Sequence, residues 1–299
     1  MNKSEKISVV IATYNREQVL LDTISYLLNL PAKPDEIIIV DQTKSHEPLI
    51  EKQLEKYHTD GNIKWIRLLS PSVTHAMNVG LLKAYHEIVL FLDDDIIPEH
   101  NLIKAHLIAH QSGNCNIVAG RVLQPWDTKE SGKEKTSIFY FNSQHRQFIN
   151  EFMGGNFSIN KNLAKELGGF DENFTHAAYR FEAEFSDRAI SASKRILFEP
   201  EATIHHIKFQ DGGIRSYGHH LTTAKPGHSV GEYYFLLISK NTKYKLLKIV
   251  IKPFRSLRTK HHLRKPWWIL PTLLSEFSGF ILALKYFIKG PKLIKLNRQ

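Results

Sequence analysis

Five apolar residues followed by three aspartates form the most constraining stretch of this chain. Residues 88–92 read Ile-Val-Leu-Phe-Leu, and Asp93, Asp94 and Asp95 follow directly. An apolar run of this length indicates a strand buried on both faces. Because side chains alternate along a strand, Asp93 and Asp95 are expected on one side and Asp94 on the other. Two carboxylates on one side suit a hard divalent cation such as Mg²⁺ or Mn²⁺; the alternative is a solvated acidic turn before a helix that starts at Pro98.

The first part of the chain alternates strand and helix patterns. Three more apolar runs, at residues 7–12, 37–40 and 63–69, are predicted as strands. Helical spacing of apolar residues predicts helices between them, the first capped by Thr13 or Asn15. This order predicts an α/β fold with a mostly parallel central sheet flanked by helices, in which ligands bind outside the carboxyl ends of the strands.

Polar residues stand at each of these expected strand ends. They are residues 13–16, 41–43 and 70–72, besides the three aspartates. The sequence has no G-x-G-x-x-G after the first strand, which argues against a dehydrogenase-type dinucleotide site, and no G-x-x-x-x-G-K-S/T, which excludes a P-loop. Phosphate would therefore be held by a metal and by basic side chains.

The net charge and the cysteine count limit the partners and the kinds of site that the chain can have. The net charge is +10, which is compatible with nucleic acid, an anionic membrane surface or polyanionic substrates. The single cysteine, Cys115, excludes an internal disulfide framework and a cysteine-built zinc site. The polar N-terminus leads straight into a strand, so we expect no signal peptide and a cytosolic compartment.

Six motifs in fixed order give the chain a family resemblance. They are SVVIATYNR, EIIIVDQT, PSVTHAMNVGL, VLFLDDDIIP, GGNFSINK and GGFDENF, within about residues 7–234. Together they resemble the family 2 glycosyltransferases of the GT-A fold, whose nucleotide-binding half is Rossmann-like. The resemblance implies a metal-dependent enzyme that moves a sugar, with inversion, from a nucleotide-sugar donor to a glycan or lipid-linked glycan acceptor. Cell-surface polysaccharide synthesis is the implied setting.

The resemblance also implies roles for individual residues. The implied donor-binding residues are Thr13, Tyr14, Asn15, Arg16, Asp41, Asn78, Asp93, Asp94, Gly155 and Asn156. Asp93 and Asp95 would bind the metal, and a late histidine, His206 ahead of His205, would add a nitrogen ligand that favours Mn²⁺ over Mg²⁺. A Gly-Gly turn before Arg215 predicts a flap that closes on the donor, with Arg215 as a phosphate contact.

The stretch from Arg180 to Arg188 is expected to carry the catalytic base. Aligning Arg188 with the arginine of the family pattern puts Glu182 on the catalytic acid and Glu184 on the acid after it. Inverting transfer needs one base to take the proton of the attacking hydroxyl, and burial lifts a glutamate pKa toward the working pH. Residues at i and i+2 do not share a helical face, so only one should point at the acceptor. The alternative is an acidic helix start with Arg188 as its partner.

Two departures from the family pattern keep a second function open. Met77 stands where the family usually has arginine, and Phe181 replaces the usual first glutamate. These changes favour the alternative of a non-catalytic nucleotide-sugar or glycan-binding module on the same fold. Trp126 and residues 139–141 are either sugar-stacking or core aromatics.

The last sixty residues change in character. We divide the chain into a GT-A domain, residues 1–238, and a basic amphipathic helical tail, residues 239–299. Residues 267–288 are apolar at helical spacing and long enough to span a bilayer. Glu276 and Lys285 make a span costly, at roughly 3 kcal/mol per central charge. We therefore expect a peripheral helix on the cytoplasmic face of an anionic membrane and no nucleic acid partner; the alternative is a helix packed on the catalytic domain.

Overall fold

A mixed sheet of nine strands organises the part of the chain that this computed structural model describes, namely residues 6–112, 115–127, 139–209, 211–213 and 220–295. The strands are β1 Ile7–Thr13, β2 Glu36–Asp41, β3 Lys64–Arg67, β4 Ile88–Leu92, β5 Ile96–Pro98, β6 Ile117–Leu123, β7 Gln147–Ile149, β8 Asn156–Asn160 and β9 Ile196–His206. Their order is β3-β2-β1-β4-β8-β6-β9-β5, and β7 pairs with β9.

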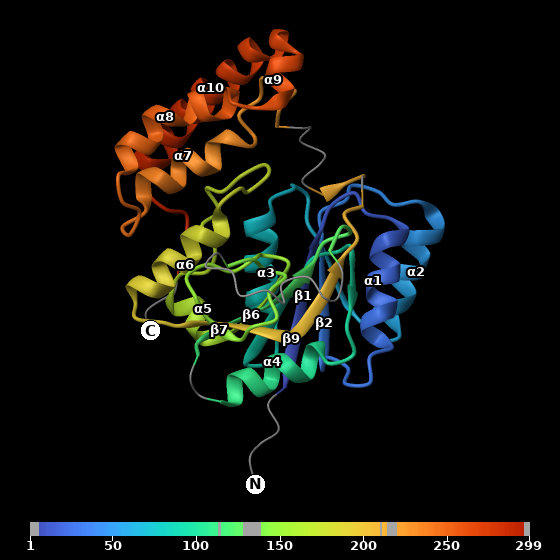
Figure 1. The fold of residues 1–299 in the computed structure, drawn as a ribbon. Helices are drawn as coiled ribbons and strands as arrows, with labels where there is room; N and C mark the ends of the chain where they lie inside the picture. The colour runs from blue at the N-terminus through green and yellow to red at the C-terminus, as the bar shows by residue number, and fades with distance from the viewer. Residues whose placement is uncertain (1–5, 113–114, 128–138, 210, 214–219, 296–299) are drawn as a thin grey trace.

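Helices cover both faces of this sheet and build a separate layer at one end (Figure 1). The helices around the sheet are α1 Gln18–Leu28, α2 Pro48–Thr59, α3 Val73–Lys83, α4 Leu102–Gln111, α5 Lys161–Glu166 and α6 Phe181–Ser191. The end layer contains α7 Ser229–Ile238, α8 Lys245–Leu257, α9 Lys260–Arg264, the short 3-10 helix Pro266–Trp268 and α10 Ile269–Lys289.

The predicted parallel half of the sheet is confirmed. β1 runs parallel to β2 and β4, and β2 runs parallel to β3. These strands are apolar on both faces because each face has its own core. In β1, Val10 points to the core beneath α3, whereas Val9 and Ile11 point to the core beneath α1. The second half is mixed, since β8 is antiparallel to both β4 and β6.

Two expected helix starts are wrong. The first helix begins at Gln18 instead of being capped by Thr13 or Asn15. Thr13 belongs to β1 and donates its hydroxyl to Asp94, and Asn15 has a left-handed backbone with φ of 52°. Pro98 likewise does not start a helix: it ends β5, which pairs with β9, and α4 follows at Leu102. In the first place a loop, and in the second a short strand, replaces the expected helix start.

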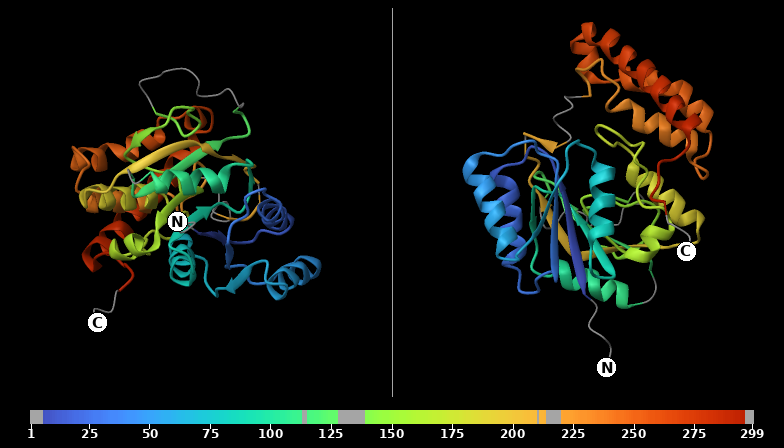
Figure 2. Two further views of the ribbon diagram at one scale, coloured as in Figure 1. Left: turned by 90° about the horizontal axis from the view of Figure 1, so that it is seen from below. Right: turned by 180° about the vertical axis from the view of Figure 1, so that it is seen from behind.

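The tail is more than a single helix, and it returns to the sheet domain. α10 packs against α7 and α8, and the chain then runs back along the body (Figure 2). The backbone N–H of Ile294 donates to the carbonyl of Gly168 at 2.8 Å, and the N–H of Glu172 donates to the carbonyl of Lys292 at 3.0 Å. The boundary after residue 238 stays a prediction.

Candidate active site

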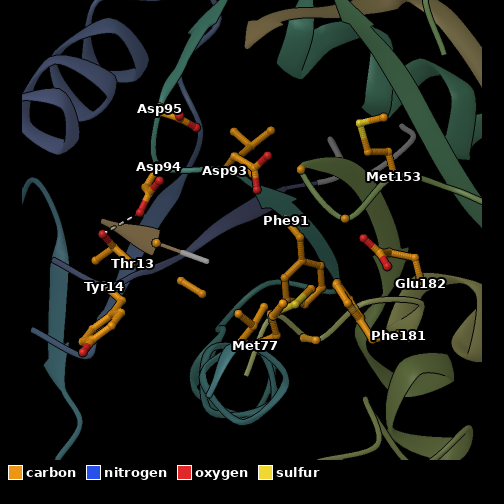
Figure 3. Close-up of a pocket in the computed structure, with 18 of the residues that line it drawn as sticks. Thr13, Tyr14, Met77, Phe91, Asp93, Asp94, Asp95, Met153, Phe181 and Glu182 are labelled. Atoms are coloured by element: carbon orange, nitrogen blue, oxygen red, sulfur yellow. Dashed lines mark hydrogen bonds between the residues drawn. The ribbon is translucent and has the colours of Figure 1, made fainter. Parts of the chain in front are cut away.

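A cavity of about 700 Å³ opens at the carboxyl ends of β1 and β4 and extends to the start of α6 (Figure 3). Its polar lining includes Thr13, Tyr14, Arg16, Gln42, Ser72, Asp93, Asp94, Asp95, Glu182 and His206. Gly154 and Gly155 line it as well. The strand ends and the α6 segment that the sequence singled out therefore meet around one space.

Asp93, Asp95 and His206 form a cluster on the wall of this cavity. Their potential ligand atoms all lie within 4.8 Å of one another. Nε2 of His206 is 3.1 Å from Oδ1 of Asp95 and 3.9 Å from Oδ2 of Asp93. His205 faces elsewhere, with its Nε2 2.8 Å from Oε1 of Glu99. Two carboxylates and one imidazole at this spacing fit a divalent cation such as Mn²⁺.

The register of the sheet explains how the histidine reaches the aspartates. β5 follows the three aspartates directly and pairs antiparallel with the end of β9, so Ile96 lies opposite His206. Asp95, the residue before Ile96, is thereby brought next to His206. Strand pairing between residues more than a hundred positions apart thus completes the cluster.

Burial and the neighbouring charges shift the pKa values of all three residues in the cluster. Burial alone would raise the pKa of Asp95, but the hydrogen bond and charge of His206, together with Arg16, outweigh it and lower that pKa. The same carboxylates raise the pKa of His206 against the effect of its burial. Burial raises the pKa of Asp93, and the charge of Asp95 adds to this. A divalent cation would stabilise both carboxylates in their ionised form.

Asp94 faces away from the cluster, as the alternation of side chains along a strand predicts. Its Oδ2 accepts a hydrogen bond from the Thr13 hydroxyl at 2.8 Å, and its Oδ1 lies 3.1 Å from Nε of Arg16. Burial raises the pKa of Asp94 to about 7, against the opposing charge of Arg16. Asp94 thus holds Thr13 and Arg16, two of the implied donor-binding residues, in place.

Arg16 also holds the segment after β9. Its guanidinium donates to the carbonyls of Phe209 and Asp211. Nearby, the backbone carbonyl of Tyr14 accepts a hydrogen bond from the N–H of Gly213 at 2.7 Å. A Cβ on Gly212 would lie 2.0 Å from the carbonyl oxygen of Asn15. The start of the expected flap therefore packs on the loop after β1. Arg215 lies outside the described residues.

Gly154 and Gly155 separate the metal-type cluster from the glutamate. A Cβ on Gly155 would lie 2.1 Å from Oδ2 of Asp93. A Cβ on Gly154 would lie 2.7 Å from the ring of Phe181 and 3.0 Å from Oε1 of Glu182. Any larger residue would collide with one of these functional groups, so the two glycines allow both carboxylates to border the same space.

Glu182 and Glu184 have different surroundings. Glu182 lines the cavity, accepts a hydrogen bond from the backbone of Gly154, and has its pKa raised to about 7, mainly by burial and then by the charges of Glu151 and Asp93. Glu184 is buried, with Oε2 2.8 Å from Nη2 of Arg188. Glu182 therefore faces the cavity and Glu184 does not; that only one of them points at an acceptor stays a prediction.

Three of the implied donor-binding residues, Asp41, Asn78 and Asn156, have side chains that are bonded to other protein groups in this structure. The Asp41 carboxylate accepts from Nε1 of Trp65 at 2.9 Å and lies 2.7 Å from Nε2 of His46. The Asn78 side chain bonds the N–H and carbonyl of Phe170, both at 2.8 Å.

Asn156 is occupied in the same way. Its Nδ2 donates to the carbonyls of Ala202 and Arg121, and its Oδ1 lies 3.0 Å from Nε2 of His106. Among the described residues, Gln42 lines the cavity beside the end of β2, whereas Asp41 does not. Asp41, Asn78 and Asn156 therefore shape the site from beneath, and their direct donor contacts stay predictions.

The two departures from the family pattern lie together in the structure. Met77 and Phe181 are buried in the core, and both line the cavity near Phe91 (Figure 3). The ring of Phe181 meets that of Phe170 edge-on, with centroids 5.9 Å apart. This part of the cavity floor is consequently apolar.

Sequence reasoning missed several residues that border the cavity. Glu151, Tyr179, Arg180 and Lys208 line it. Nη1 of Arg180 is 3.2 Å from Oε1 of Glu151, and Nζ of Lys208 lies 4.0 Å from the ring centroid of Trp126. They lie in loops or just before a helix, where no periodic pattern marks a residue as facing the ligand.

Comparisons with known proteins agree with this architecture. The family model described as glycosyl transferase family 2 matches residues 8–184. The probable glycosyltransferase YdaM of Bacillus subtilis (strain 168) is 24% identical over 222 residues, which cover 68% of this chain and 50% of that protein. Chondroitin synthase of Pasteurella multocida (strain Pm70) is 27% identical over 123 residues, covering 40% of this chain and 12% of that protein. The chain thus spans half or less of the length of these relatives.

Solved structures share the fold at low identity. GalNAc-T7, crystallised with UDP, GalNAc and Mn²⁺, superposes with a TM-score of 0.66 at 16% identity, over 97% of this chain and 58% of that one. The mannosyltransferase PcManGT from Pyrobaculum calidifontis, in complex with GDP-Man and Mn²⁺, gives 0.56 at 16% identity, over 97% and 80%. The α/β fold is therefore that of the GT-A glycosyltransferases, and the chain belongs to glycosyl transferase family 2.

Proposed function

We propose that this protein transfers a sugar, with inversion, from a nucleotide-sugar donor to a glycan or lipid-linked glycan acceptor, in a reaction that depends on Mn²⁺ or Mg²⁺. A hexose is the proposed sugar, and cell-surface polysaccharide synthesis is the proposed setting. One observation supports the proposal above the others: Asp93, Asp95 and His206, which fit a cation, border the same cavity as the half-buried Glu182.

The proposed general base is Glu182. Its pKa of about 7 lets the carboxylate form exist near neutral pH and still accept a proton readily. The Glu182 oxygen would take the proton of the acceptor hydroxyl as that hydroxyl attacks the anomeric carbon. Gly154 would orient the carboxylate through its backbone N–H.

The proposed donor site lies at the carboxyl end of β1. Asp93, Asp95 and His206 would hold the cation, which when bound would neutralise the donor pyrophosphate. Thr13, Tyr14, Asn15 and Arg16 would surround the nucleotide. Fixed by Asp94, the Arg16 guanidinium is already oriented before a donor arrives.

An assay of nucleotide release from sugar nucleotides in the presence of Mn²⁺ tests this proposal. Purified protein is incubated with Mn²⁺ and each member of a panel of UDP-, GDP- and dTDP-sugars, and nucleotide release is measured. We expect release from one donor class, suppression by chelator, and a large loss in Glu182→Gln. The product formed on an added acceptor should have the opposite anomeric configuration to the donor when examined by NMR.

The competing function, a non-catalytic nucleotide-sugar or glycan-binding module, gives a different result in the same assay. Met77 and Phe181 are the observations in its favour, because they replace polar residues of the family pattern. Such a module would bind one donor by calorimetry yet release no nucleotide above the level of Glu182→Gln.

A further inference from the structure

The helix α10 is amphipathic, but its small and polar residues face the protein and many of its large apolar residues face outward. Its buried residues are small or polar and form one stripe: Thr272, Ser275, Glu276, Gly279 and Ala283. Its exposed side carries large apolar residues, between 47% and 82% exposed: Leu270, Leu274, Phe277, Ile281, Phe287 and Ile288. A helix that only completed a protein core would have the opposite arrangement.

Specific contacts hold the polar stripe inward. Nζ of Lys252, on α8, lies 2.7 Å from Oε2 of Glu276, and both residues are buried. The Ser229 hydroxyl, on α7, donates to the carbonyl of Ser275 at 2.7 Å. A Cβ on Gly279 would lie 2.1 Å from the Ser229 oxygen, so no larger residue fits there. Rotating α10 to bury its apolar side would break all of these contacts.

The neighbouring helix α8 extends the exposed apolar surface. Lys252 is its only buried residue, whereas Leu246, Leu247, Val250 and Phe254 are 56% to 74% exposed. α8 and α10 contact each other and lie side by side in Figure 1. We call the exposed apolar residues of these two helices the tail face. Exposed apolar surface on two adjoining helices indicates a partner or a lipid phase.

The charge around the tail face limits the kinds of partner that fit it. Residues 240–289 contain twelve lysines and arginines and one carboxylate, Glu276. The other 249 residues contain 28 cations and 29 carboxylates, so the entire net charge of the chain comes from this segment. A second copy would bring the same positive charge and be repelled. Nucleic acid would match the charge and leave the apolar residues in water, whereas an anionic lipid surface matches both.

The contacts of α10 with α7 and α8 distinguish a helix that lies on a membrane from one that crosses it. Among the described residues, the stretch Pro266–Lys289 is long and apolar enough to span, with a mean hydropathy of 1.4. Its inner stripe is bonded to α7 and α8 through Ser229 and Lys252. Crossing would expose Glu276 to hydrocarbon or carry its partners inside as well. The helix therefore suits the interface, parallel to the bilayer.

We infer that the tail face docks on an anionic bilayer, as a peripheral contact on the cytoplasmic side of the membrane. α7 would link this contact to the active site. Cζ of Arg180 lies 4.9 Å from the ring centroid of Phe235 on α7, and a Cβ on Gly231 would lie 2.1 Å from the carbonyl of Tyr179. The edge of the cavity at Tyr179 and Arg180 thus adjoins the membrane-bound layer, where a lipid-linked acceptor would arrive.

Vesicle binding tests the surface without any donor present, so it is independent of the proposed sugar transfer. The full chain is mixed with phosphatidylglycerol vesicles or with phosphatidylcholine vesicles, and the sedimented fraction is measured. We expect binding to the anionic vesicles that weakens with salt, and weak binding to the neutral ones. A double variant, Phe254→Glu with Phe277→Glu, should reduce partitioning by about tenfold or more.

The matched control is Leu49→Glu, at an apolar residue of α2 that is 81% exposed and lies outside the tail face. It should bind vesicles like the wild type, and all variants should retain the wild-type melting temperature. Wild-type protein that stays in the supernatant at low salt, or a double variant that still sediments fully, would overturn the inference. So would a wild-type dimer that the double variant dissociates in light scattering, because the tail face would then join two copies.

Discussion

Arg188 and Glu184 form a two-point ion pair across one turn of α6, with Nη2 of the arginine 2.8 Å from Oε2 of the glutamate. The Arg188 guanidinium also donates to the carbonyl of Gly169 at 2.8 Å. This pair occupies Glu184 on the core side of the helix. Glu182, two residues earlier, points into the cavity instead. The two glutamates should therefore respond differently to the same substitution.

Glu182→Gln should lower kcat by about 100-fold or more while donor affinity is retained, because the amide keeps its size and cannot take the proton. Glu184→Gln is the matched control. It should lower the melting temperature by weakening the Arg188 pair and should leave much of the activity per folded molecule. Steady-state kinetics and thermal unfolding on both variants decide the assignment, and the opposite pattern would move the base to Glu184.

The pH profile follows from the same carboxylate. Only ionised Glu182 accepts a proton, and its pKa is raised to about 7, mainly by burial. The wild-type kcat/KM should therefore fall about tenfold per pH unit below pH 7 and level off above it. In Glu182→Gln this step should disappear from the residual rate. A wild-type profile that stays flat between pH 5 and 8 would contradict the assignment.

The raised pKa of Glu182 should also make the stability of the fold depend on pH. The pKa of Glu182 is higher in the folded state than its ordinary value of 4.5, so folding favours the protonated form. The carboxylate destabilises the fold increasingly as pH rises from 4.5 to about 7. Glu182→Gln should thus be more stable than the wild type at pH 8, and the difference should vanish near pH 4. Urea unfolding at both pH values measures it.

The motifs predicted more of the site than the secondary-structure pattern did. The strand ends and the alternation of Asp93, Asp94 and Asp95 came from residue order and side-chain periodicity, which are local. The choice of Glu182 came from the family resemblance. The antiparallel pairing of β8 was not predicted, because pairing direction depends on contacts between distant segments. The partners of Asp41, His46 and Trp65, were missed for the same reason.

The tail shows a different limit of the sequence. Apolar spacing correctly indicated a long helix, but it could not show that Lys252 lies opposite Glu276. A sequence pattern gives the two faces of a helix without saying which face packs. Here the polar face is packed, because its charge has a buried partner on α8.

Metal binding should depend on Asp95. Asp95→Asn keeps the shape of the side chain and removes the charge that faces His206, so the affinity for Mn²⁺ should fall by about tenfold or more. Electron paramagnetic resonance of free Mn²⁺ measures this without donor or turnover. Asp22→Asn, on the solvent side of α1, is the control and should bind Mn²⁺ like the wild type. Equal affinity in all three proteins would remove this cluster as the metal site.

The buried pair of the tail should stabilise the protein through its mutual dependence. Lys252→Ala leaves Glu276 buried without its cation and should cost about 3 to 5 kcal/mol of unfolding free energy. Lys248→Ala, one turn earlier and exposed, should cost little. Replacing both partners, as Lys252→Met with Glu276→Leu, should recover most of the loss, because no charge is then left unpaired. Urea unfolding of the four proteins separates these cases; equal stability of Lys252→Ala and Lys248→Ala would show that the inner stripe of α10 is not held by this pair.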